Sequence, residues 1–270
     1  MRKKSLKNKL LSLIKKEKKI GLVLGGGGAR GIAHVGVLKV LAQNGIPIHM
    51  IAGTSSGALF GALYAGGLSI KAMEAASKRA GWNRLIRLAL TRRGAVSGES
   101  MERLVEEAIG PKEFSNLSIP FVAVASDLRT GERVVIREGS VAKAIHASSA
   151  IPGVFVPVHI NGKLLSDGMV TDNVPVDVMN EMGADVIIAV DVIPKVILDE
   201  EPENMVKVVE RSLDIGMKLA SQSIVSDADF LIEPVTKNIG PFALNYADEL
   251  IRMGVEATET VVPEIKKRLR

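Results

Sequence analysis

The sequence contains no cysteine among its 270 residues. This absence excludes disulfides, thiolate metal sites and cysteine nucleophiles, and it is compatible with either redox compartment. Aromatic residues make up only 3% of the chain, which argues against proteins that stack nucleic-acid bases on aromatic side chains. The four histidines lie at positions 34, 49, 146 and 159, and none of their spacings fits a zinc-binding pair on one helix. We therefore expect neither a metal ion nor a cofactor.

Basic charge is concentrated at the N-terminus. The formal net charge is +5, but residues 1–19 alone hold nine Lys or Arg and one Glu. Residues 20–270 are therefore mildly acidic, with a net charge of −3. A nucleic-acid-binding protein would carry its positive charge over the folded domain, so we expect no nucleic-acid partner.

The basic segment 1–19 also carries apolar residues at the spacing of one helical face. These residues are Leu6, Leu10, Leu13 and Ile14. The apolar run 10–14 is followed at once by two lysines, which makes it too short for a secretory signal. We therefore predict a cytoplasmic protein that contacts an anionic membrane peripherally through this amphipathic segment. A solvated basic tail is the open alternative.

The rest of the chain, 20–270, is predicted to form one α/β domain. An apolar run at 20–24 enters a glycine-rich loop, a helical pattern follows at 29–43, and a second strand and helix are expected at 47–52 and 56–65. Strand–helix alternation of this kind predicts a three-layer α/β/α fold with a mainly parallel central sheet. We expect further strands at 119–125, 133–137, 186–191 and 229–233, further helices at 70–80, 99–109, 174–182, 203–225 and 244–269, and a surface loop at 84–98.

The glycine-rich loop reads Gly26-Gly27-Gly28-Ala29-Arg30-Gly31. Glycines between a strand and a helix leave backbone N–H groups uncovered at a helix N-terminus, where negative charge is favoured. The same letters fit a dinucleotide-binding fingerprint, which also needs an acidic residue about 20 positions further on. The chain has no Asp or Glu between Gly31 and Glu74. A nucleotide-binding protein is therefore the weaker of the two interpretations.

A second motif, Gly53-Thr54-Ser55-Ser56-Gly57, follows the second predicted strand and precedes a helix. In this context a G-x-S-x-G motif places its serine on a sharp turn with the hydroxyl exposed at the edge of the sheet. Ser55 is therefore the candidate nucleophile. A turn of small residues that merely packs a helix on a sheet is the alternative.

A serine nucleophile needs a base, and the common chain order Ser, Asp, His is not available here. The last histidine, His159, precedes the best acidic candidate, Asp167. A triad that uses His146 or His159 in another order stays open, whereas His34 and His49 fit structural roles better. The carboxylates that compete with Asp167 are Asp127, Asp172 and Asp191.

Three motifs in this order, the glycine loop, the G-x-S-x-G turn and Ser166-Asp167-Gly168, resemble the signatures of patatin-like phospholipases. Four further segments agree with this resemblance. They are Ala33-His34-Val35-Gly36-Val37-Leu38, Ser126-Asp127-Leu128, Ser149-Ala150-Ile151-Pro152-Gly153-Val154-Phe155 and Asn173-Val174-Pro175. The resemblance covers about residues 20–235 and is closest to the small single-domain bacterial members.

The resemblance implies a catalytic dyad in which Ser55 attacks the ester carbonyl and Asp167 takes its proton. It assigns the oxyanion hole to the backbone amides of Gly27, Gly28 and Ala29, and support of the loop to Gly26, Arg30 and Gly31. Two positions depart from the family pattern: Met169 stands where glycine or alanine follows the Asp-Gly pair, and Leu24 stands where an acidic residue often leads the glycine loop. Neither departure removes a catalytic atom.

The expected function is therefore hydrolysis of carboxylic esters of lipid acyl chains, on a phospholipid or lysophospholipid, through an acyl-enzyme. An esterase of soluble acyl esters or thioesters is the nearest alternative. A membrane-associated scaffold that keeps the fold without catalysis is the alternative from another class.

Overall fold

The computed structural model describes residues 18–79, 88–91, 94–194, 201–222, 224–236 and 239–270. The strands of its main sheet are β1 (Ile20–Leu24), β2 (Met50–Thr54), β5 (Phe121–Asp127), β6 (Arg133–Ile136), β7 (Val158–Ile160), β8 (Lys163–Asp167), β9 (Val186–Val190) and β10 (Phe230–Ile232). The helices are α2 (Ala33–Gln43), α3 (Ser56–Ala65), α4 (Ile70–Arg79), α6 (Glu99–Ile109), α7 (Val141–Ser148), α8 (Val176–Glu181), α9 (Met205–Ser221) and α10 (Ala247–Leu269).

The main sheet is mostly parallel. Strands β10, β9, β1, β2 and β5 lie in that order and pair in parallel. Strands β6 and β8 pair with β5 in antiparallel fashion, and β7 pairs in the same way with β8. The expected three-layer α/β/α fold with a mainly parallel sheet is confirmed, with an antiparallel end that the sequence analysis did not foresee.

The pairing of β5 brings two strand ends together. Strand β2 pairs with residues 121–124 of β5, whereas β8 pairs with residues 125–127. Strand β6 pairs with residues 123–126 and overlaps both. Because a strand has two edges, β6 occupies one edge, and β2 and β8 lie end to end along the other. The last residues of β2 and β8 therefore meet, which places Ser55 beside Asp167.

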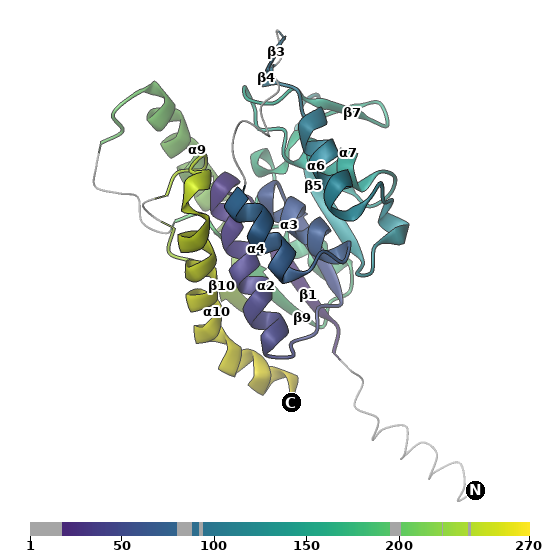
Figure 1. Ribbon diagram of the computed structural model, residues 1–270, viewed down its shortest axis with the longest axis vertical. Coiled ribbons are helices and arrows are strands. Elements are labelled where there is room, and N and C mark those ends of the chain that lie inside the picture. The colour runs from purple at the N-terminus through teal and green to yellow at the C-terminus, as the bar shows by residue number, and fades with distance from the viewer. Residues whose placement is uncertain (1–17, 80–87, 92–93, 195–200, 223, 237–238) are drawn as a thin grey trace, which may run out of the picture.

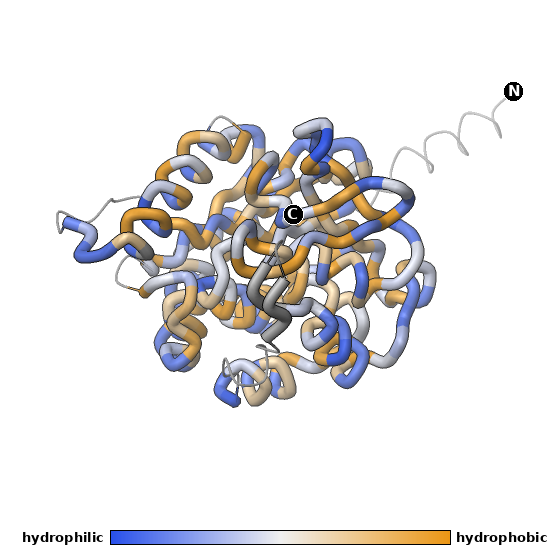
Figure 2. Tube along the Cα trace, turned by 90° about the horizontal axis from the view of Figure 1, so that it is seen from above, coloured by the Kyte–Doolittle hydropathy of each residue, from blue (hydrophilic) through white to orange (hydrophobic). Residues whose placement is uncertain are grey.

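The two faces of the sheet pack against hydrophobic cores of different size. Along β1, Leu22 and Leu24 belong to the larger core beneath α2, α3 and α10, whereas Val23 belongs to the smaller core beneath α8. This alternation follows the two-residue period of a strand. Figure 1 shows α2, α4 and α10 side by side over one face, and in Figure 2 hydrophilic segments lie mainly at the outer turns. Among the described residues, no helix is both long and apolar enough to cross a membrane.

Helices α2 and α10 cross at a pair of glycines. A Cβ on Gly36 would meet the carbonyl oxygen of Ile251, and a Cβ on Gly254 would meet the carbonyl oxygen of Ala33. The backbones approach so closely because neither position carries a side chain. This crossing holds the C-terminal helix against the helix that follows the glycine loop.

Several predicted boundaries need correction. The first helix begins with a 3₁₀ turn, η1 (Gly28–Ile32), and becomes α-helical at Ala33. The strand expected at 47–52 runs from Met50 to Thr54. Part of the loop expected at 84–98 forms a hairpin of β3 (Leu88–Thr91) and β4 (Gly94–Val96). The basic segment falls almost entirely outside the described residues, so its helix and the boundary at residue 19 stay predictions.

Candidate active site

Ser55 sits on a strained turn between β2 and α3. Its φ and ψ are 54° and −123°, values that an L-residue adopts only where the surrounding structure enforces them. Its backbone N–H donates to Ser148 Oγ at 2.9 Å, and that hydroxyl donates to the carbonyl of Val124 at 2.6 Å. The turn is therefore fixed to β5 through Ser148. It places the Ser55 side chain at the N-terminus of α3, where the helix dipole favours negative charge.

The Ser55 hydroxyl is bonded to Asp167. Ser55 Oγ donates to Asp167 Oδ2 at 2.7 Å, and the other carboxylate oxygen, Oδ1, accepts from the Met169 N–H at 2.9 Å. The Asp167 side chain is fully buried. Ser126 Oγ donates to the backbone carbonyl of Asp167 at 2.9 Å and so holds the end of β8.

Burial in low dielectric disfavours the charged form of a carboxyl group. Desolvation therefore raises the pKa of Asp167 from 3.8 to about 7, and the hydrogen bonds from Met169 and Ser55 lower it by a smaller amount. A carboxylate with a pKa near neutrality is a stronger base than an exposed one. This property suits a group that takes a proton from a serine hydroxyl.

The glycine loop lies beside this pair, and two of the three amides that the resemblance assigns to the oxyanion hole are engaged. The Gly27 N–H donates to Ser56 Oγ at 3.0 Å, and the Ala29 N–H donates to the Pro241 carbonyl at 2.7 Å. Gly28 has a φ of +60°, and a Cβ there would strike the Pro241 oxygen. Within the described residues the Gly28 amide makes no hydrogen bond. Of the three amides compared, that of Gly28 is the one without a partner among the described residues.

Arg30 holds the glycine loop in place, and its positive charge is paired with a carboxylate. Its Nε donates to the Ile239 carbonyl at 2.7 Å, and both Nη atoms reach the Asp214 carboxylate at 2.8 Å. A bidentate pair of this kind is strong and directional. Because Asp214 lies on α9, the pair ties that helix to the glycine loop. Asn173 Nδ2 holds the other end by donating to the Gly26 carbonyl at 3.2 Å, and the side chain of Ser56 fills the space beside Gly31.

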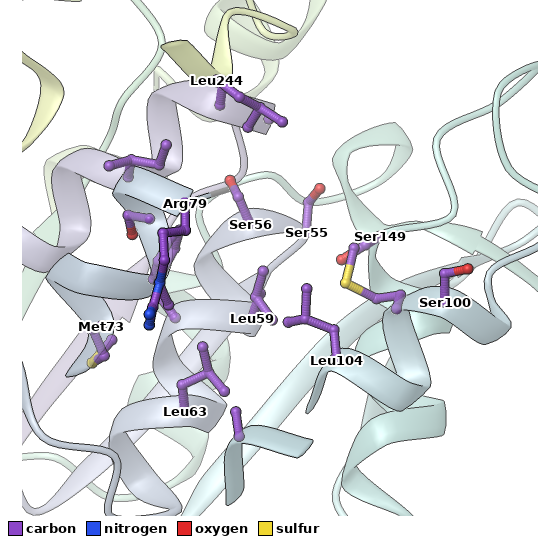
Figure 3. Close-up of a pocket in the computed structure, with 18 of the residues that line it drawn as sticks. Ser55, Ser56, Leu59, Leu63, Met73, Arg79, Ser100, Leu104, Ser149 and Leu244 are labelled. Atoms are coloured by element: carbon purple, nitrogen blue, oxygen red, sulfur yellow. The ribbon is translucent and has the colours of Figure 1, made fainter. Parts of the chain in front are cut away.

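A cavity of about 690 Å³ opens at Ser55 and extends between α3, α4 and α6 (Figure 3). Its lining is mostly apolar and includes Leu59, Leu63, Met73, Met101 and Leu104. Gly28, Ala29 and Pro241 line the cavity together with Ser55. The cavity also contains two buried hydroxyls, those of Ser77 and Ser149, that have no hydrogen-bond partner within the described part of the chain. Ser55 therefore faces an apolar pocket with a few polar groups.

The comparison with known families assigns the chain. The model of the family described as patatin-like phospholipase matches residues 22–180, which include the glycine loop, Ser55 and Asp167. The chain belongs to the patatin-like phospholipase family.

Curated relatives of this patatin-like chain match about 64% of it. An uncharacterized NTE family protein of Mycobacterium tuberculosis is 37% identical over 175 residues, which cover 48% of that protein. Neuropathy target esterase sws of Drosophila melanogaster is 36% identical over 181 residues, and lysophospholipase nte1 of Aspergillus fumigatus is 37% identical over 179 residues. The matches cover 13% and 12% of these two proteins, so the chain spans half or less of the length of the relatives it matches.

Two solved structures share the patatin-like fold of this chain. VipD from Legionella pneumophila matches with a TM-score of 0.64 and 15% identity, over 92% of this chain and 67% of VipD. The type III effector protein ExoU matches with a TM-score of 0.54 and 13% identity, over 94% of this chain and 53% of ExoU. At such identities the likeness shows the fold alone.

Within the described residues, no histidine of this patatin-like domain is hydrogen-bonded to Ser55 or Asp167, and three of the four have other partners. His34 Nε2 donates to the Gly25 carbonyl at 2.8 Å, and burial lowers its pKa to about 4, so it braces the loop as a neutral ring. His49 Nδ1 accepts from the Ile20 N–H, and His146 Nδ1 pairs with Glu102 Oε1 at 2.6 Å. His159 is exposed on β7.

The carboxylates that compete with Asp167 for the role of base are each bonded to another group. Asp127 accepts from the Arg129 N–H inside a turn. Asp172 pairs with Arg133 at 2.8 Å, and Asp191 pairs with Lys218 at 2.7 Å. The carboxylate that the fold brings to the Ser55 hydroxyl is that of Asp167. No group of three or more acidic or histidine side chains within the described ranges could hold a metal ion.

Sequence reasoning missed the residues that support the site. Ser148 and Asp214 had no assigned role, yet they fix the Ser55 turn and the Arg30 side chain. Ser148 directly precedes the quoted Ser149-Ala150-Ile151-Pro152 stretch, which was a usable signal. Asp214 carried no signal, because its contact depends on where α9 lies in space.

Proposed function

We propose that this protein hydrolyses carboxylic esters of lipid acyl chains through a covalent acyl-enzyme formed on Ser55. The observation that carries this proposal is the 2.7 Å hydrogen bond from Ser55 Oγ to the buried Asp167 carboxylate at the mouth of an apolar cavity. The matched family and the relatives named esterase and lysophospholipase support the same reaction class.

In the first half-reaction, Ser55 Oγ attacks the ester carbonyl carbon and its proton passes to Asp167. The tetrahedral intermediate then expels the alcohol, which takes the proton from Asp167 and leaves the acyl group on Ser55. In the second half-reaction, a water molecule gives its proton to Asp167 and attacks the acyl carbon. Ser55 recovers that proton, and a carboxylic acid is released.

The negative charge on the intermediate needs preorganised donors. We assign the first of these to the Gly28 amide, because it lines the cavity and is not engaged within the described structure. The Gly27 and Ala29 amides serve only after they leave Ser56 Oγ and the Pro241 carbonyl. One such donor contributes about 3 kcal/mol to lowering the barrier.

The cavity supports an acyl chain as the bound part of the substrate. Ser55, Leu59 and Leu63 lie one turn apart along α3, a span of about 12 Å, and Figure 3 shows the two leucines in succession below the nucleophile. Each buried methylene contributes about 0.8 kcal/mol. A long-chain ester therefore gains binding energy here that a short-chain ester does not.

The proposal is tested with a fluorophosphonate probe followed by peptide mass mapping. The expected adduct is on Ser55, and Ser55→Ala should abolish labelling. Asp167→Asn should lower turnover by about 10²–10⁴-fold, whereas His159→Ala, a substitution on an exposed strand, should leave turnover unchanged. Labelling at another residue, or full activity of Asp167→Asn, contradicts the assignment.

Substrate comparison separates the alternatives that the sequence leaves open. Phospholipids, lysophospholipids and short esters or thioesters are assayed on the same preparation. Hydrolysis confined to short soluble substrates would favour a soluble esterase. Folded protein that neither labels nor hydrolyses any of them would favour a non-catalytic scaffold.

A further inference from the structure

Helix α9 presents its apolar side to solvent. Five of the nine large hydrophobic side chains that are exposed in the described residues lie on this one helix. They are Met205 at 79%, Val208 at 46%, Val209 at 53%, Leu213 at 39% and Leu219 at 67% relative exposure. At 100° per residue these positions form a stripe roughly 140° wide along the helix. We call these five residues the α9 stripe.

The polar side of α9 faces the protein. Asp214 forms the bidentate pair with Arg30, and Lys218 binds Asp191 at 2.7 Å and Glu233 at 3.0 Å. Met217 is the one large hydrophobic residue of α9 among the buried residues of the described structure. This orientation is the reverse of the usual one, in which a surface helix turns its apolar face to the core. The described residues of the domain therefore leave the stripe uncovered.

The charges of α9 suit a lipid surface. Both acidic side chains of the helix are paired, Glu210 with Lys207 at 2.8 Å and Asp214 with Arg30. Neither carboxylate of the helix is therefore left unpaired where it would disfavour contact with lipid. An amphipathic helix of this kind, apolar on one face and charged on the other, lies in the plane of a bilayer interface.

The size of the stripe also favours lipid over a second copy of the chain. A 17-residue helix is about 25 Å long and about 10 Å across, so one face of it covers about 250 Å² in projection. A stable protein dimer buries about 800 Å² on each partner. Insertion into lipid has no such threshold, because each apolar side chain gains as it enters the acyl region.

The position of α9 connects the stripe to the cavity. The start of the helix lies beside Gly240, since a Cβ there would lie 3.4 Å from Lys207 Nζ, and the next residue, Pro241, lines the cavity. In Figure 1, α9 lies at the periphery of the domain. A helix docked on a membrane would therefore hold the cavity close to the lipid surface.

We propose that the α9 stripe is the surface through which this protein docks on lipid aggregates. The inference rests on the proposed function, because a lipid substrate presents itself at such a surface. Docking supplies contact with the aggregate, and the chemistry at Ser55 does not depend on it.

The experiment measures partition of the full chain onto zwitterionic phosphatidylcholine vesicles, which lack the negative charge that would attract the basic N-terminal segment. The double variant Val209→Ser with Leu213→Ser should bind these vesicles about 10- to 100-fold more weakly than the wild type. The matched control is Leu128→Ser, an exposed leucine in the turn after β5, which should bind as the wild type does. Circular dichroism verifies that each variant is folded.

Catalytic readouts separate this proposal from the preceding one. The double variant should hydrolyse a monomeric short-chain ester at the wild-type rate and show a raised KM, with an unchanged kcat, on vesicle lipid. Equal vesicle binding by wild type and double variant would overturn the docking proposal and leave the ester hydrolysis standing. A wild-type dimer in sedimentation that the double variant abolishes would assign the stripe to a second copy instead. Loss of vesicle binding in a protein that hydrolyses no ester would support docking and refute the proposed function.

Discussion

Asp167→Asn should be more stable than the wild type, and this difference in the free energy of unfolding should grow as the pH rises. We expect this result even though the substitution removes the proposed base. Burial raises the pKa of Asp167 from 3.8 to about 7. Between these two values the folded protein holds a proton that the unfolded chain has released. The stability of the wild type therefore falls as pH increases through this window, by about 1.4 kcal/mol per unit. Asparagine keeps the shape of the side chain and carries no titrating group.

The size of the effect follows from the width of the window. A shift of roughly three units corresponds to about 4 kcal/mol once the carboxyl is ionised in both states. Between about pH 5 and about pH 8, the wild type should lose about 2 to 3 kcal/mol relative to Asp167→Asn. In the variant the asparagine oxygen accepts from the Met169 N–H, and its NH₂ group donates to Ser55 Oγ, which reverses the direction of that hydrogen bond.

Urea denaturation of wild type and variant at these two pH values measures the difference. Ser55→Ala is the control, because it also abolishes the proposed chemistry but keeps the carboxylate, so its stability should still decline with pH. Parallel curves for wild type and Asp167→Asn would refute the reasoning, since they would mean that the carboxyl is not destabilised by burial.

Four further outcomes are expected. The kcat/KM for a soluble ester should rise with pH through about 7 in the wild type, because Asp167 must be ionised to accept the Ser55 proton; a flat profile over that range would contradict this. Leu63→Trp should shorten the cavity and lower kcat/KM for dodecanoyl esters by about 10²-fold or more while butyryl esters are spared; equal losses on both would place the acyl chain elsewhere. Gly254→Leu should lower the free energy of unfolding by about 1–3 kcal/mol or more, because the side chain would enter the backbone of α2; urea denaturation measures it, and an unchanged midpoint would mean that the crossing adapts. Deletion of residues 2–18 should weaken co-sedimentation with anionic liposomes and reduce its salt sensitivity, with hydrolysis of a soluble ester retained; equal binding with and without the segment would leave the basic residues without a membrane role.

The sequence analysis found the strands that precede the glycine loop and the serine turn and also β6, but it missed β7 and β8 at the antiparallel end of the sheet. The run 20–24 and the serine turn were readable because buried parallel strands read as apolar runs, and because Gly25 follows the first run and Gly53 lies near the end of the second. The hairpin of β7 and β8 was missed, although Asn161-Gly162 with φ values of 49° and 77° is a strong two-residue turn signal. Recognising it would have predicted that Asp167 ends a strand.

The sequence analysis also missed helix α7. Its eight residues form a short, alanine-rich run that lacks a long apolar repeat. Its start was marked by Ser140, whose side chain accepts from the Lys143 N–H as an N-cap. The engagement of the Gly27 and Ala29 amides was not readable, because their partners lie 29 and 212 residues further along the chain. Such contacts depend on tertiary structure alone.

The Pro241 carbonyl on the Ala29 amide has a consequence for selectivity between ground state and transition state. Without substrate, the Ala29 amide donates to a neutral carbonyl of the protein itself, that of Pro241. An incoming ester carbonyl is the same kind of acceptor, so an exchange of one for the other brings little net gain in binding. An oxyanion is a stronger acceptor, since hydrogen bonds to charged groups are roughly twice as strong. If Ala29 joins the oxyanion hole, the exchange with Pro241 becomes favourable only as charge develops on the substrate. The Pro241 carbonyl then competes with the substrate for the Ala29 amide, so that this amide stabilises the transition state more than the bound ester.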